Sequence, residues 1–177
     1  MKCVKQPIVT SSTRTEDTIT HGTLTLIFDG SYHPEVNARQ YAYLVADYEP
    51  LGLKEGEKVY FHYLTILDKP NIPPDKWLVH PKVLYCVIRD GEIEMLNDYT
   101  LVEIEEEPKA SSLLILPKKK STSTGIVKYT NTPELKEGDR VIFKKTGAFE
   151  NKIEGVDYYV MDSWHILCKI LDSRIAS

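Results

Sequence analysis

The chain has 177 residues, of which 42% are hydrophobic and 27% are charged, and its formal net charge is -4. This is the composition of an ordinary globular protein, long enough for one good core or two small ones. Acidic and basic residues are interleaved through most of the sequence, which argues against a nucleic-acid partner because no broad basic stripe results. The apolar runs are too short to cross a bilayer and residues 1–20 are polar, so we expect a cytoplasmic protein without a membrane anchor.

Strand-like runs and turn signals alternate along the chain. Residues 23–28, 58–63 and 140–143 are rich in the Val, Ile, Tyr and Thr that favour β-strands. The turn signals are Asp29–Gly30, Glu55–Gly56, Asp90–Gly91, Glu137–Gly138 and Glu154–Gly155. No window keeps a helical period beyond about one turn, and ten prolines interrupt the rest. The pattern predicts an all-β protein made of small sandwiches or barrels.

One motif occurs twice in the sequence. The stretch Leu53–Phe61 (LKEGEKVYF) returns as Leu135–Phe143 (LKEGDRVIF), an offset of 82 positions. Other windows align at the same offset: Leu44–Val45 with Ile126–Val127, Trp77–Val79 with Tyr159–Met161, and Leu84–Ile88 with Ile166–Ile170. Several windows in one register indicate a duplicated unit of roughly 80 residues, a plausible size for a small domain.

The junction of the two repeats carries no flexible linker. Asp90–Gly91 is a two-residue hairpin signal between two strand-like stretches, residues 77–88 and 93–104. Because no Gly/Ser-rich or Pro-rich spacer lies between the repeats, we expect them to be coupled rigidly rather than tethered loosely.

The three cysteines predict neither disulfides nor a metal site. Cys3, Cys86 and Cys168 are too few and too widely spaced for a disulfide framework or a zinc site. Cys86 and Cys168 occur in apolar, strand-like segments, where a free cysteine acts as a small hydrophobic residue. We therefore expect both side chains to be buried.

The second repeat resembles the GroES-like co-chaperonin family over nearly its whole length. The resemblance is carried by four motifs in family order: Leu96–Val102, Thr124–Val127, Leu135–Phe143, and Tyr158–Met161 followed by Ile166–Leu167. The first repeat shares the middle motif and the closing strands. The resemblance implies two tandem GroES-like small β-barrels, with an N-terminal tail at 1–18, a degenerate barrel without a mobile loop at 19–91, and a complete barrel at 92–177.

The same resemblance implies a chaperonin-binding loop at about residues 105–123. Family members carry a three-residue aliphatic tip there, which Leu114, Ile115 and Leu116 match, preceded here by Leu113. A few aliphatic residues between Ser and Lys/Ser/Thr neighbours are expected to stay mobile and to order on binding, although a short apolar run can also form a buried strand. The corresponding region of the first repeat, taken as Asp29–Arg39, is shorter and polar, so we expect no docking there.

No catalytic constellation or cofactor motif is recognisable. The histidines fall on no metal or triad pattern: His21, His33, His62, His80 and His165. We therefore expect neither an enzyme nor a cofactor. The resemblance implies instead a homo-oligomeric ring that caps a GroEL-type chaperonin and encloses unfolded client proteins. Two other functions stay open: a phage-type lid for a bulky client, and a structural or adaptor protein that has lost chaperonin binding.

Overall fold

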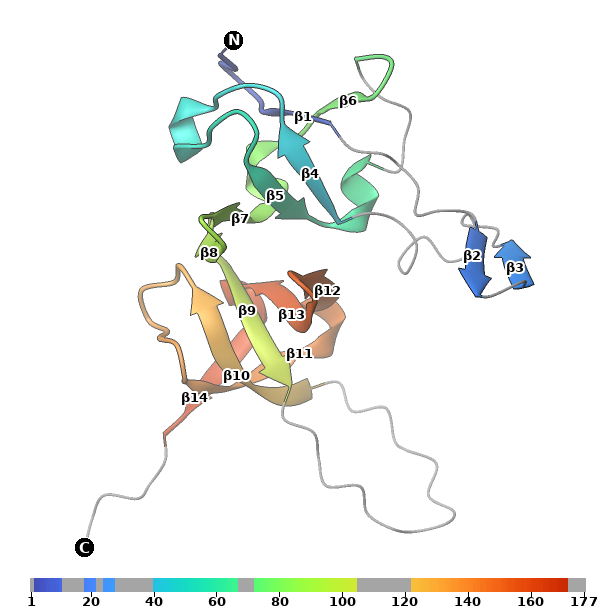
Figure 1. Cartoon of the computed structure of the whole chain (residues 1–177). Helices are drawn as coiled ribbons and strands as arrows, with labels where there is room; N and C mark the ends of the chain where they lie inside the picture. Colours follow the sequence, from blue (N-terminus) through green and yellow to red (C-terminus); the bar gives the residue numbers. More distant parts are fainter. Residues whose placement is uncertain are drawn as a thin grey trace, which may run out of the picture. The chain divides into compact units, whose positions relative to one another are not determined.

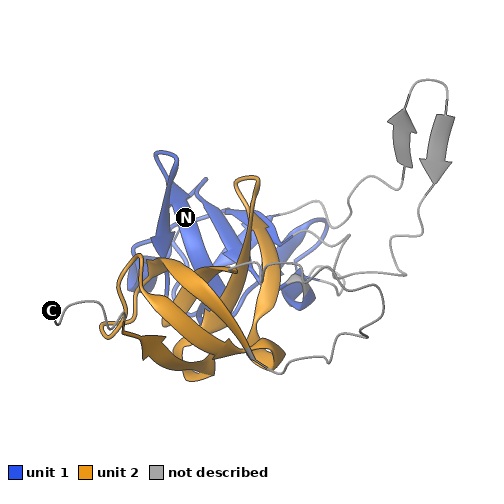
Figure 2. Ribbon diagram, turned by 90° about the horizontal axis from the view of Figure 1, so that it is seen from below, with its two compact units in different colours: residues 1–96 blue, residues 97–177 orange. Residues whose placement is uncertain are grey.

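The computed structural model describes residues 2–10, 18–21, 24–27, 40–66, 72–104 and 122–171. Within these residues the regular elements are β-strands and short 3-10 turns, which confirms the prediction of an all-β protein (Figure 1). The chain divides into two compact units, Met1–Leu96 and Asn97–Ser177, which Figure 2 shows in separate colours.

The first unit contains a six-stranded antiparallel sheet with the strand order β6-β1-β4-β5-β7-β8. Its strands are β1 (Ile8–Thr10), β4 (Tyr41–Leu44), β5 (Lys58–Phe61), β6 (Lys76–Leu78), β7 (Leu84–Arg89) and β8 (Glu92–Met95). The strands β2 (Thr18–His21) and β3 (Leu24–Ile27) pair only with each other among the described residues. Short 3-10 turns lie at Glu49–Leu51, Tyr63–Ile66 and Pro81–Val83.

The second unit contains another six-stranded antiparallel sheet, in the order β12-β13-β9-β10-β11-β14. Its strands are β9 (Tyr99–Ile104), β10 (Thr122–Thr130), β11 (Arg140–Lys144), β12 (Phe149–Ile153), β13 (Val156–Asp162) and β14 (Ile166–Ile170). Two 3-10 turns lie at Lys145–Gly147 and Ser163–His165. Two six-stranded antiparallel sheets agree with the expectation of two GroES-like β domains.

Five strands have the same order in both units. The series β6-β1-β4-β5-β7 corresponds to β13-β9-β10-β11-β14. The pairing is irregular at the same place, between Tyr60 and Phe61 in the first unit and between Ile142 and Phe143 in the second. The sequence repeat is therefore also a repeat of topology and of local strand geometry.

The alignment of β4 with β10 differs by one residue from the sequence-based one. Leu44 pairs with Val9, and Val127 occupies the same place opposite Val102, so Leu44 corresponds to Val127 rather than to Ile126. Leu44 and Val127 are both buried. A one-residue slip moves every side chain of a strand to the opposite face. The sequence comparison missed the slip because the extra residue lies in the turn that follows β4.

The first strand of the first unit lies inside the segment expected to be an N-terminal tail. Val9 of β1 pairs with Leu44 on one side and with Trp77 on the other. Val102 of β9 pairs in the same way with Val127 and Tyr159. β1 is therefore the counterpart of β9, and the short, proline-preceded run Ile8–Thr10 gave too little pattern to be recognised.

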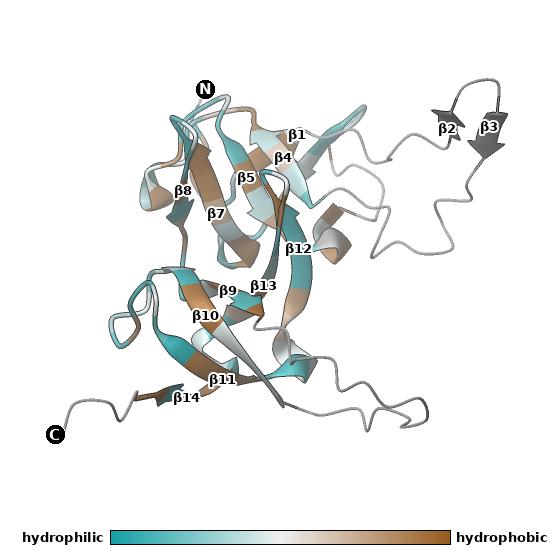
Figure 3. Ribbon diagram, turned by 60° about the horizontal axis from the view of Figure 1, so that its bottom comes forward, coloured by the Kyte–Doolittle hydropathy of each residue, from teal (hydrophilic) through white to brown (hydrophobic). Residues whose placement is uncertain are grey.

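Each unit has its own apolar core, and Figure 3 colours the hydrophobic segments of the strands brown. In the second unit the core consists of Val102, Val127, Val141, Phe143 and Met161. The core of the first unit includes Val9, Leu44, Val59, Phe61, Trp77, Leu84 and Val87. Burying a side chain of this size stabilises the fold by about 1.5–3 kcal/mol. In each unit, apolar residues of the repeated strands thus face the core from one side of the sheet.

Candidate functional site

The predicted chaperonin-binding residues Leu113, Leu114, Ile115 and Leu116 lie outside the described residues, as does the whole segment 105–121. The structure describes the two strands from which this segment departs. β9 ends at Ile104, whose Cα partner on the adjacent antiparallel strand β10 is Gly125. Residues 105–121 therefore connect two neighbouring strands at one end of the second sheet.

Gly125 is required where β9 and β10 meet at this end. A methyl group at its Cα would lie 2.4 Å from Val102 Cγ1 and 2.6 Å from the carbonyl oxygen of Glu103. Both distances are far shorter than a normal van der Waals contact. Only glycine lets β9 and β10 approach so closely at this pair, which is the last described pair of the two strands before the segment 105–121.

The repeated motif Leu135–Phe143 forms the turn into β11. Gly138 has a φ of 86°, a left-handed conformation that favours glycine. Asp139 Oδ2 accepts a hydrogen bond from the Lys136 backbone N–H at 2.8 Å. Asp139 Oδ1 lies 2.6 Å from Lys169 Nζ on β14. The bond from Lys169 is the main reason that the pKa of Asp139 lies below its usual value. The motif therefore closes a turn and fastens β14 to it.

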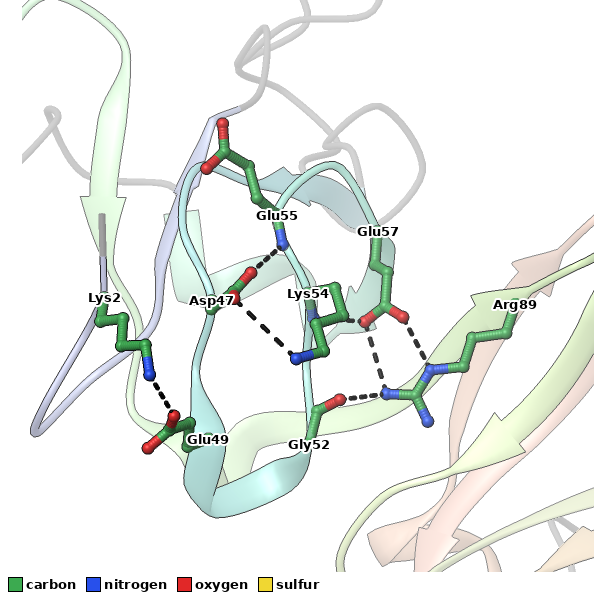
Figure 4. A network of polar contacts seen from close by, with 8 residues as sticks. All are labelled: Lys2, Asp47, Glu49, Gly52, Lys54, Glu55, Glu57 and Arg89. Carbon is green, nitrogen blue, oxygen red and sulfur yellow. Dashed lines mark hydrogen bonds and ion pairs between the residues drawn. The ribbon is translucent and has the colours of Figure 1, made fainter.

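The first unit repeats this arrangement with different side chains (Figure 4). Glu57 Oε2 accepts a hydrogen bond from the Lys54 backbone N–H at 2.8 Å, and Glu57 Oε1 lies 2.7 Å from Arg89 Nε. Arg89 also donates to the Gly52 carbonyl oxygen at 2.7 Å and pairs with Glu94. Arg89 of β7 thereby links the turn before β5 to β8. Sequence reasoning missed this residue because its partners are far apart in the chain.

The edge strand β14 is covered differently from its counterpart β7. On β7, Tyr85 and Cys86 are buried, and the Tyr85 carbonyl accepts a hydrogen bond from Leu96 N–H at 2.7 Å beyond the end of β8. In the described part of the chain β14 pairs only with β11. The expectation that Cys168 is buried is therefore wrong. Cys86 is covered because β8 lies beside it, and Cys168 has no such strand in the described chain.

Large apolar side chains surround this edge. Trp164 is 87% exposed, Leu167 47% and Leu171 78%. An exposed edge strand with apolar side chains is a ready template for pairing with another strand. The sequence alignment matches Leu167 with Tyr85 of β7, which is buried, and it offers no signal for Trp164 or Leu171. The pattern of apolar residues along β14 does not by itself show whether another strand lies beside it.

The described residues contain neither a candidate metal centre nor a candidate membrane-spanning helix. No group of three or more His, Cys, Asp or Glu side chains among them could hold a metal ion. None of the helical segments described is long and apolar enough to cross a membrane.

Comparison with known proteins assigns the second unit to a family. Residues 92–170 match the family model described as chaperonin 10 Kd subunit. The co-chaperonin GroES of Fervidobacterium nodosum is 36% identical over 86 residues, which are 45% of this chain and 97% of that protein. The co-chaperonin GroES of Pseudothermotoga lettingae is 38% identical over 86 residues, with the same two coverages of 45% and 97%.

The relative from Thermosipho africanus, also a co-chaperonin GroES, is 38% identical over 76 residues, covering 39% of this chain and 84% of that protein. All three of these relatives are co-chaperonin GroES proteins. The unit that they match is an antiparallel β domain with a long connection between its first two strands. The chain belongs to the chaperonin 10 Kd subunit family, to which the GroES co-chaperonins belong. This confirms the resemblance drawn from the sequence and supports a co-chaperonin role in general.

Proposed function

We propose that this chain forms a ring-shaped lid on a GroEL-type chaperonin and assists ATP-dependent folding of client proteins in the closed cavity. The observation that carries the proposal is the family match over residues 92–170, which includes the connection between β9 and β10. The tip residues Leu113–Leu116 fall inside this connection. We expect the lid to act in the cytoplasm, and ATP hydrolysis belongs to the chaperonin rather than to the lid.

The proposed mechanism is differential binding. A lid that binds the open form of the chaperonin better than the closed form shifts the equilibrium toward the open form. Each copy contributes one short aliphatic tip, Leu114–Leu116, and therefore only a small apolar contact. Several copies in one ring bind together by avidity, so the complex is stable and still releasable.

The exposed edge of β14 supports the ring. The strand lacks, in the described chain, the neighbour that β8 supplies to β7, and Leu167 and Leu171 are exposed beside it. A strand from a second copy would bury these side chains and complete the backbone hydrogen bonds of the edge. In this proposal the edge of β14 joins the copies into a ring, and the connection between β9 and β10 binds the chaperonin.

The test is ATP-dependent co-sedimentation with a GroEL-type chaperonin. The parent chain is compared with the triple variant Leu114→Ser/Ile115→Ser/Leu116→Ser. The matched control is Leu114→Ile/Ile115→Leu/Leu116→Ile, which keeps the tip aliphatic. We expect the parent and the control to sediment with the chaperonin and the serine variant to stay in solution. Absence of binding by the parent, with a cognate chaperonin also tried, would favour the adaptor function instead.

A further inference from the structure

Trp164 lies at the start of β14 with 87% of its surface exposed. The 3-10 turn that carries it is held by Asp162. Asp162 Oδ1 accepts a hydrogen bond from the Trp164 backbone N–H at 3.1 Å and lies 2.7 Å from His165 Nδ1. Tryptophan side chains gain much from burial and are frequent anchors of protein–protein contacts. An exposed tryptophan on a fixed turn therefore indicates an interaction surface.

The first unit contains an open groove beside its N-terminal segment, which we call the N-terminal groove. It has a volume of about 610 Å³ and is lined by residues 2–6, Ile8, Leu78, His80 and Pro81. This volume lies in the range of pockets that hold ligands. Val4 and Leu78 are exposed apolar residues of the lining, and Lys5 adds a cation. The groove therefore suits an aromatic side chain, whose π face also attracts an ammonium group.

The chain itself shows which kind of segment lies beside the last strand of a repeat. β8 directly precedes β9, the first strand of the second unit, yet it pairs with β7 of the first sheet. Just beyond β8, the Leu96 N–H donates a hydrogen bond to the Tyr85 carbonyl at 2.7 Å. β14 corresponds to β7, and β1 to β9. For β14, the equivalent neighbour is the segment before β1 of another copy.

The spacing of the repeat places Trp164 beside the N-terminal groove of that copy. Corresponding residues lie 93 positions apart between β1 and β9 and 82 positions apart between β7 and β14. The two residues joined by the hydrogen bond just described therefore have Cys3 and Leu167 as counterparts. Because antiparallel segments run in opposite directions, the chain before Leu167 lies beside the chain after Cys3. Trp164 of one copy then faces residues 4–6 of the next, which line the groove.

The junction between copies needs a side-chain contact at this point. The Cys3 N–H already donates to the Asp47 carbonyl of its own unit at 2.9 Å, so it does not serve a neighbouring copy. The counterpart of Trp164 in the first unit is Lys82, whose backbone N–H is likewise bonded to the residue two positions before it. The edge that β8 covers thus carries a lysine, and the edge that no described strand covers carries a tryptophan.

We propose that Trp164 of one copy of this chain inserts into the N-terminal groove of the next copy. The tryptophan and the groove lie on different units, so the contact is heterologous, and repeated heterologous contacts close a ring when the rotation permits it. This inference rests on the ring of the proposed function. It names the side chain and the surface that hold neighbouring copies together.

Tryptophan fluorescence of the full chain tests this contact. The chain has two tryptophans, and Trp77 is already buried at 2% exposure, so a change on assembly reports on Trp164. We expect the emission maximum to move to shorter wavelength as the protein concentration rises through the range in which copies associate. Trp164→Phe keeps an aromatic ring and should assemble without this shift.

Analytical ultracentrifugation measures the association of the same variants, with circular dichroism to check that each is folded. Trp164→Ala should weaken association about tenfold or more, and the control Val156→Ala, at an exposed apolar residue away from β14, should stay within about twofold of the parent. Leu78→Ser removes part of the groove and should also weaken association. Added to Trp164→Ala, it should cost less than about twofold more, because the contact is already lost.

Each other outcome overturns the inference. If the parent assembles while its emission is unchanged and Trp164→Ala associates equally well, Trp164 holds no neighbour and the proposed ring stands. If the emission shifts but Leu78→Ser has no effect on association, Trp164 packs against a surface other than the N-terminal groove. If the parent stays monomeric at every concentration, both the ring and this contact are wrong.

Discussion

Replacing Gly125 by alanine is expected to destabilise the second unit strongly. The added methyl group would lie 2.4 Å from Val102 Cγ1 and 2.6 Å from the carbonyl oxygen of Glu103. Val102 is fully buried and has a branched side chain with restricted rotamers, and the carbonyl belongs to the backbone of β9. Neither group can move away without separating the two strands. Overpacking of this kind costs about 1–3 kcal/mol, and we expect the upper half of that range.

A free-energy cost of this size can be measured as a shift in melting temperature. In a domain of 60–100 residues, 1 kcal/mol lowers the melting temperature by about 4–8 °C, so a cost of about 2–3 kcal/mol for Gly125→Ala should lower that of the second unit by about 8–24 °C. Scanning calorimetry of the full chain measures the shift. Hydrogen exchange of the β9 and β10 amides shows that the loss is in the second unit.

The matched control is Ala42→Gly in the first unit. Ala42 pairs with Val59 as Gly125 pairs with Val141, so it occupies the same place in the other repeat. Its removal should cost about 1 kcal/mol through backbone entropy and a lost methyl contact. If Gly125→Ala melts within about 2 °C of the parent, β9 and β10 can separate at no cost, and the argument that their close approach requires this glycine is wrong.

Three further perturbations test other parts of the structure. Arg89→Met should destabilise the first unit by about 1–3 kcal/mol in urea denaturation, because Glu57 is left largely buried without its charged partner. Asp139→Asn should lower the stability of the second unit at pH 7 by about 1 kcal/mol through the lost bond to Lys169. Since the folded pKa of Asp139 is lowered, this stability is present above the unfolded pKa of about 4 and is lost as the pH falls through the folded value, so parent and variant should converge in acid. Leu167→Lys on β14 should abolish ring assembly, measured by light scattering after gel filtration, without changing the melting temperature of the dissociated chain.

Controls for these three use exposed residues. Lys54→Met should change stability by less than about 0.5 kcal/mol, since its contact with Asp47 is long, at 3.9 Å, and its side chain is exposed. Val156→Lys places a charge on an equally exposed apolar residue away from β14 and should leave assembly intact. A full loss of assembly in both lysine variants would refute the role of the β14 edge. A constant difference between the Asp139 variant and its parent from pH 7 to pH 2 would refute the charge-based account.

The turns of the fold can be predicted from residues that are adjacent in the sequence. The Gly138 turn, with its left-handed φ and the Asp139 carboxylate over Lys136 N–H, depends on residues adjacent in the chain. The same holds for Gly56 and Glu57 in the first repeat. Such motifs are recognisable without a structure, because their geometry is set by backbone freedom and short-range hydrogen bonds. They sufficed to predict an all-β duplicated chain and its family.

The placement of β1 could be decided only by pairing. Ile8–Thr10 is a strand because Val9 has Leu44 and Trp77 beside it, and these partners are 35 and 68 positions away. Its recognition also showed that residues 11–40 are the counterpart of 105–121. Three residues carry too little periodicity to be identified alone, so both conclusions depended on long-range contacts.

The sequence by itself thus determined the strand content, the turns, the repeat and the family of the second unit, because each depends on neighbouring residues or on similarity along the chain. Tertiary structure alone decided the one-residue shift that matches Leu44 with Val127, the close approach at Gly125, and the different exposure of Cys86 and Cys168. The physical reason is that burial and register are properties of the neighbouring strand. β7 has β8 beside it, and β14 has no such neighbour in the described chain.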